Sequence, residues 1–99
     1  MLVNITIQPE LYTIIIEFDV TPDTSQDEVK KVIHNSMVAI AESSHVGDVD
    51  FNGYLGGSPE DKVLWVAYAG STLWEIDWTN LEPSEVYGPA SILELHPPF

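Results

Sequence analysis

Residues 24–44, TSQDEVKKVIHNSMVAIAESS, form the one stretch of this chain that has the pattern of a long helix. Ser25, followed three residues later by Glu28, is a capping box, and acidic residues near a helix N-terminus complement the helix dipole. Behind this cap, apolar residues recur at intervals of three and four, which places them on one stripe: Val29, Val32, Ile33, Met37, Ile40 and Ala41. A helix with one apolar stripe needs an apolar surface to pack against, and we expect the flanking segments to provide it.

Those segments alternate between apolar and polar residues, which is the pattern of half-buried strands. We predict strands at residues 2–8, 11–20, 45–55, 62–69 and 72–79, with a short last strand at 92–96. A turn at Pro9 and Glu10 joins the first two as a hairpin, and a turn at Gly70 and Ser71 joins the fourth and fifth. The order ββαββ plus an edge strand predicts a single α+β domain, residues 1–99. It is a two-layer sandwich in which one long helix packs on one face of a mostly antiparallel sheet.

Acidic residues dominate the charge of the chain: sixteen Asp and Glu oppose three lysines and no arginine, for a net charge of −13. A surface of this sign repels nucleic acid and anionic membranes and attracts basic proteins and cations. The absence of cysteine excludes a disulfide framework, a thiol nucleophile and a zinc–thiolate site. With no signal-peptide pattern and no apolar run of membrane length, we expect a soluble cytoplasmic protein (host cytoplasm if viral) that uses no cofactor.

Three of the predicted strands carry acidic residues at i and i+2: Glu17 and Asp19, Asp48 and Asp50, Glu75 and Asp77. If the helix covers the apolar face of the sheet, these pairs lie on the opposite face, with roughly 6.5–7 Å between the two members of a pair. That spacing is close to the roughly 6–7 Å between phosphates along one strand of nucleic acid. Two interpretations stay open: the ordinary solvent face of an acidic protein, or an anionic surface that binds a basic partner. No pair is singled out as catalytic, and we predict no enzymatic activity.

Residues 48–53, DVDFNG, resemble the first half of an EF-hand calcium loop. In this alternative the oxygen ligands are Asp48, Asp50, Asn52 and Glu60. The bidentate glutamate of such a loop belongs at its twelfth position, which is Pro59 here, so Glu60 comes one residue late. Strand-like sequence also follows where a second helix should begin. We therefore favour a strand and keep a divalent-cation loop as the alternative.

Aromatic residues are candidates for both core and contact roles. Trp74 and Trp78 share a face of their predicted strand, which favours core packing. Trp65 lies in the nearly all-apolar strand at 62–69 and is the best candidate for an exposed anchor, with Tyr54 or Tyr68 beside it. A homodimer through that strand is equally compatible with the pattern.

Our leading hypothesis is a non-enzymatic acidic inhibitor or decoy that occupies the basic nucleic-acid-binding surface of another protein. Phage anti-CRISPR and anti-restriction proteins and the immunity proteins of toxic nucleases have such roles, an analogy of charge and size alone. The predicted partner-binding residues are Glu17, Asp19, Asp48, Asp50, Glu75, Asp77, Trp65 and Tyr54. A calcium-dependent module and a small sugar- or peptide-binding domain with exposed aromatics are the alternatives. We expect no direct contact with nucleic acid or membranes.

Overall fold

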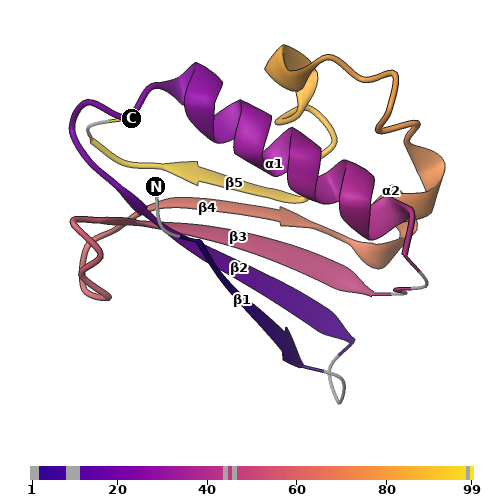
Figure 1. The fold of residues 1–99 in the computed structure, drawn as a ribbon, viewed down its shortest axis with the longest axis horizontal. Helices are drawn as coiled ribbons and strands as arrows, with labels where there is room; N and C mark the ends of the chain where they lie inside the picture. Colours follow the sequence, from indigo (N-terminus) through magenta and orange to yellow (C-terminus); the bar gives the residue numbers. More distant parts are fainter. Residues whose placement is uncertain (1–2, 9–11, 44, 46, 98) are drawn as a thin grey trace.

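The computed structural model describes residues 3–8, 12–43, 45, 47–97 and 99, and its elements form two layers (Figure 1). In chain order they are β1 (Val3–Gln8), β2 (Thr13–Val20), α1 (Gln26–Ala41), β3 (Asp48–Leu55), β4 (Lys62–Tyr68), α2 (Gly70–Glu75), the 3-10 turn η2 (Pro83–Glu85) and β5 (Ile92–Leu95). The predicted turn at Pro9 and Glu10 lies outside the described residues, as do residues 2, 11, 44 and 46 of the predicted elements.

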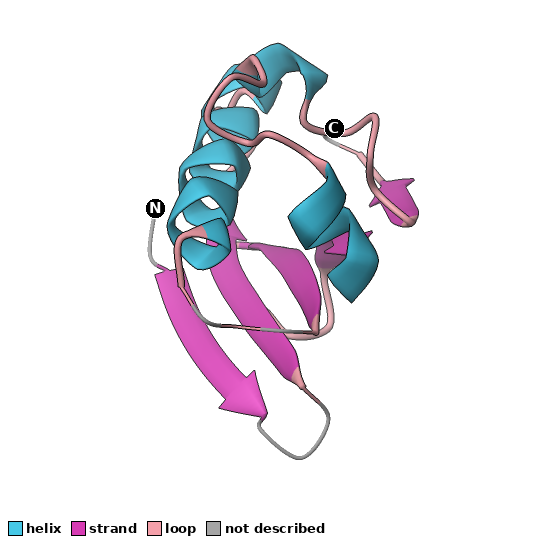
Figure 2. Ribbon diagram, turned by 90° about the vertical axis from the view of Figure 1, so that its right-hand side faces the viewer, coloured by secondary structure: helices cyan, strands magenta, loops and turns pink. Residues whose placement is uncertain are grey.

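One five-stranded sheet, in the order β1-β2-β3-β4-β5, forms the first layer. Antiparallel pairs join β1 to β2, β3 to β4 and β4 to β5, whereas β2 and β3 are parallel. A parallel pair requires a crossover connection, and α1 supplies it by running across one face of the sheet (Figure 1). Helix α2 lies on the same side (Figure 2). The predicted class, an α+β fold with a mostly antiparallel sheet and one long helix on one face, is confirmed.

Helix α1 begins and packs as the sequence predicts. The Ser25 hydroxyl accepts a hydrogen bond from the backbone N–H of Glu28 at 3.1 Å, which caps the first turn. Val29, Ile33 and Met37 are completely buried in the core. The remaining residues of the predicted stripe are half-buried at its margins: Val32, Ile40 and Ala41.

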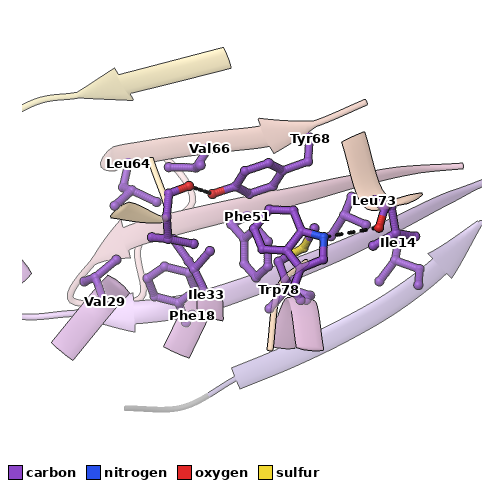
Figure 3. Packing of buried hydrophobic residues seen from close by; sticks show 14 of the residues in the cluster. Ile14, Phe18, Val29, Ile33, Phe51, Leu64, Val66, Tyr68, Leu73 and Trp78 are labelled. Carbon is purple, nitrogen blue, oxygen red and sulfur yellow. Dashed lines mark hydrogen bonds between the residues drawn. The ribbon is translucent and has the colours of Figure 1, made fainter. Parts of the chain in front are cut away.

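The hydrophobic core lies between α1 and the sheet (Figure 3). The rings of Phe51, Tyr68 and Trp78 meet edge to face there, with successive centroids 6.1 and 5.3 Å apart. The Trp78 indole N–H donates to the carbonyl of Leu73 at 3.2 Å, and the Tyr68 hydroxyl donates to the carbonyl of Val86. Each buried aromatic polar group in this cluster therefore has a partner, and the predicted core role of Trp78 is confirmed.

The predicted strand at residues 72–79 is wrong. Helix α2 begins at Gly70, and the position beside β4 in the sheet belongs to β5. Trp74 is 56% exposed, so its predicted core role is wrong as well, whereas Trp78 is buried. The alternation of apolar and polar residues here is too short to separate a strand from a short helix followed by extended residues.

Gly47 fixes the end of the sheet at which β2 and β3 both begin. Its φ is +144°, and a Cβ built on it would lie 1.8 Å from the carbonyl oxygen of Tyr12. That carbonyl accepts a hydrogen bond from the backbone N–H of Asp48 at 2.9 Å. Only glycine allows this close backbone approach, so Gly47 helps to set the start of the parallel pair.

Candidate partner-binding surface

The sheet face opposite α1, called the open face below, carries the polar partners of the strand alternation. Alternate residues of β2 are buried beneath α1, so the residues between them, Glu17 and Asp19, point to the open face. The same alternation in β3 places Asp48 and Asp50 on that face. Two of the three predicted acidic pairs therefore share one face of neighbouring strands.

The parallel register of β2 and β3 arranges these four residues in one line. Asp50 lies opposite Ile15, so Glu17 comes one same-face position further along the neighbouring strand. The line runs from Asp48 to Asp50 along β3, crosses diagonally to Glu17, and continues to Asp19 along β2. Each of these steps is roughly 7 Å. We call these four residues the carboxylate line.

The third predicted pair does not lie on the sheet. Glu75 is the last residue of α2, and Asp77 follows it in the connection toward η2. Asp77 Oδ2 accepts a hydrogen bond from the Asn80 side-chain amide at 2.5 Å. The expectation that Glu75 and Asp77 extend the acidic sheet face is therefore wrong, and both side chains are exposed elsewhere.

Asp50 is one of three half-buried members of the carboxylate line, and its ionisation is disfavoured. Burial raises the pKa of its carboxyl, and the nearby charge of Asp48 raises it further. The charge of Lys62 and a hydrogen bond with the Trp65 side chain act in the opposite direction without cancelling the shift. A positive group from a partner would therefore relieve an existing electrostatic cost at this position.

Trp65 contributes to the open face from β4, but it is half-buried and already has a cationic neighbour. The Nζ of Lys62 lies 4.2 Å from the centroid of its ring. Of the three lysines in the chain, only Lys62 lies on this face, because the other two belong to α1. Trp65 is therefore partly exposed on the open face with Lys62 over its ring, and its role as an anchor stays a prediction.

Tyr54 and Asn52 complete the centre of the open face. Burial, followed by a hydrogen bond with the Glu17 carboxylate and its charge, raises the pKa of Tyr54. Asn52 lies between Glu17 and Trp65 in the strand pairing and is only 8% exposed. Its Oδ1 is buried and accepts no hydrogen bond from the described residues, so it is an unsatisfied polar atom beneath this face. Tyr68, the other aromatic predicted beside Trp65, lies in the core instead.

The segment with the calcium-loop pattern is strand β3, which confirms the strand favoured from the sequence, and it does not have the loop conformation that the calcium alternative requires. Its Asp48 side chain has a structural partner: Oδ1 accepts a hydrogen bond from the backbone N–H of Gly70, the first residue of α2, at 2.9 Å. Glu60 is exposed in the connection between β3 and β4. Among the described residues, no three His, Cys, Asp or Glu side chains are grouped closely enough to hold a metal ion.

The sequence reasoning missed two residues of the open face, Lys62 and Glu94, and the burial of Asn52. Lys62 stands at the start of an apolar strand, and a register shift in the pairing of β3 with β4 brings it opposite Tyr54. Glu94 of β5 lies opposite Trp65 and adds an exposed carboxylate. The alternation of β5 contained the signal for Glu94, whereas the burial of Asn52 depends on neighbours from other strands.

Comparisons of the chain with models of known families, with curated proteins and with solved structures found no match. Within the described part of the chain, none of the helices has both the length and the apolar content needed to cross a bilayer.

Proposed function

We propose that this protein is a non-enzymatic acidic binding protein whose open face occupies the basic nucleic-acid-binding surface of another protein. The observation that supports this best is the carboxylate line, four acidic side chains at steps of roughly 7 Å, which resembles the phosphate spacing of one nucleic-acid strand. The net charge of −13 supports it independently, because a partner that binds nucleic acid is itself basic.

In this proposal, charge and packing have separate roles. The long-range field of the acidic surface speeds encounter with a basic partner and makes it sensitive to salt. Trp65 and Tyr54 then supply the short-range contact, since half-buried aromatics carry much of the affinity of protein interfaces. A partner's lysine or arginine that approaches the half-buried Asp50 carboxylate supplies a charge partner that offsets the repulsion from Asp48.

Such a protein would act as an inhibitor of a nucleic-acid-binding enzyme in the cytoplasm. Phage anti-CRISPR or anti-restriction proteins, acting in the host cytoplasm, and nuclease immunity proteins are the classes of this kind that we propose. The partner would be released by competing DNA or RNA, because both occupy the same basic surface.

The test is affinity capture from a cell extract on three immobilised baits: the wild type, Glu17→Gln/Asp19→Asn, and Glu75→Gln/Asp77→Asn. The two double variants remove the same charge, but only the first removes it from the carboxylate line. We expect a nucleic-acid-binding protein to be retained at low salt by the wild type and the Glu75/Asp77 variant. Added duplex DNA or RNA should release it.

Loss of retention should be confined to the Glu17/Asp19 variant. Equal loss in both double variants would mean that net charge alone governs binding, and the open face would not be the site. Retention by all three baits, or release that does not respond to DNA or RNA, would contradict the proposal.

A further inference from the structure

Strand β1 is a sheet edge without the usual protection against pairing with another strand. It pairs with β2 through all six residues, without a register shift, and its sequence VNITIQ contains no charge and no proline. Edge strands in natural sheets are normally short or bulged, or they carry lysine or proline. The opposite edge follows this rule, because β5 has four residues, includes Glu94 and is soon followed by Pro97.

An apolar groove runs along β1 on the side of α1. Ile5 and Ile7 point to the core side of the sheet, yet each is 64% exposed because the helix does not cover this edge. The groove between β1 and α1 has a volume of about 360 Å³, and its helix wall includes Ala39 and Ile40. Among the described residues, no charged side chain lines it, in a chain whose net charge is −13.

We propose that a second copy of this chain occupies this edge, through antiparallel pairing of the two β1 strands about a two-fold axis. Two copies that each carry a charge of −13 repel one another, so they can approach closely only where both surfaces lack charge. The edge and groove of β1 are such a surface. The pairing also closes, because only the protected β5 edges remain in the dimer, so it does not continue into a filament.

The register of the pairing follows from the two faces of the sheet. A two-fold axis perpendicular to the sheet keeps both α1 helices on the same side, which requires odd-numbered residues of β1 to face odd-numbered residues. Centring the axis at Ile5 or at Thr6 satisfies this condition. Both choices bring isoleucines of the two strands within cross-strand contact, roughly 4.5–5.5 Å between Cβ atoms, and join the two apolar grooves.

The strength of the charge repulsion between the two copies depends on the salt concentration. Glu17 lies opposite Asn4 of β1, one strand in from the edge. The Glu17 residues of the two copies are therefore three strand spacings apart across the sheet and two or four residues apart along the strands, a separation of roughly 16–20 Å. This exceeds the Debye length of about 8 Å at physiological ionic strength but not that of about 30 Å in dilute salt. The dimer should therefore strengthen as salt rises, whereas binding to a basic partner should weaken.

The experiment is sedimentation velocity over a series of protein concentrations, in about 0.05 M and about 0.5 M NaCl. Ile5→Glu/Ile7→Glu is the disrupting variant, and Leu93→Glu/Leu95→Glu is its control. The control introduces the same charge on exposed leucines (45% and 37%) of the other edge strand. Because all four side chains are substantially exposed, both variants should fold, which circular dichroism checks.

We expect concentration-dependent dimers of the wild type and of the control that are favoured by high salt, and only monomers of the Ile5/Ile7 variant. Hydrogen exchange of the wild type provides a second readout that requires no substitution. The backbone amides of β1, but not those of β5, should become more protected as dimers form. A wild type that stays monomeric at high salt, or a dimer that the control abolishes equally, overturns the proposal. The inference does not rest on the proposed function. Rising salt should strengthen the β1 dimer but weaken binding of a basic partner to the open face, so the two can fail independently.

Discussion

Asp50 is a carboxylate that folding places in an unfavourable environment. Burial and the charge of Asp48 raise its pKa above the usual 3.8. The pKa of Asp50 is therefore higher in the folded state than in the unfolded state. The contribution of Asp50 to stability is full below its unfolded-state pKa and is lost as pH rises through its folded-state pKa. At neutral pH the ionised Asp50 therefore lowers the free energy of unfolding. A residue with such a cost is typical of a binding site.

We expect Asp50→Asn to raise the free energy of unfolding at neutral pH by about 0.5 kcal/mol, a small gain because solvent screens a side chain that is only half-buried. Urea denaturation measures it, and the gain should shrink at about pH 3, where the carboxyl is protonated in both states. Asp61→Asn, an exposed residue between β3 and β4, is the control. An equal gain in this control would assign the effect to net charge.

At the level of elements, α1 and β2 could be predicted because their signals are local: a cap with apolar spacings of three and four, and a two-residue alternation. Helix α2 could not, because the carboxylate of Asp48 that accepts a hydrogen bond from Gly70 comes from a distant strand. The candidate site was predictable in part. Both of its acidic pairs were visible, but the diagonal step from Asp50 to Glu17 depends on a parallel register that no local pattern contains.

The segment after α2 is held against α1 by Tyr87. Its hydroxyl donates to Gln26 Oε1 at 2.7 Å, and the Nζ of Lys30 lies 5.0 Å from the centroid of its ring. Burial raises the pKa of Tyr87 to about 12. The contribution of this phenol to stability is therefore full below its unfolded-state pKa of about 10 and is lost as pH rises through the folded-state value.

We expect the melting temperature to fall above about pH 10, and Tyr87→Phe to reduce that fall. Part of the fall should remain, because burial also raises the pKa of Tyr68. Melting curves from neutral pH to about pH 11 measure the difference. Tyr12→Phe, at a side chain that is 65% exposed, is the control and should leave the alkaline profile unchanged. If Tyr87→Phe behaves like this control, Tyr87 does not hold the segment in the way the contacts indicate.

At the scale of the whole molecule, charge is unevenly distributed. The carboxylate line lies on the open face, whereas β1 and the described residues that line the groove beside it carry no charge. The proposed dimer would join two open faces across the β1 strands and present two carboxylate lines on one surface. A basic partner large enough to span both lines would then bind two sites at once, which raises apparent affinity without any new kind of contact.

The net charge also predicts how the protein responds to calcium. Repulsion among sixteen acidic side chains lowers stability in dilute salt, so any added salt should raise the melting temperature. In strand β3, Asp48, Asp50 and Asn52 stand roughly 7 Å apart in succession, too far to converge on one ion at about 2.4 Å. We therefore expect millimolar CaCl2 to raise the melting temperature no more than MgCl2 at the same concentration. A shift that only calcium produces would show a specific site and restore the calcium alternative, because a ligand of the folded state stabilises it by mass action.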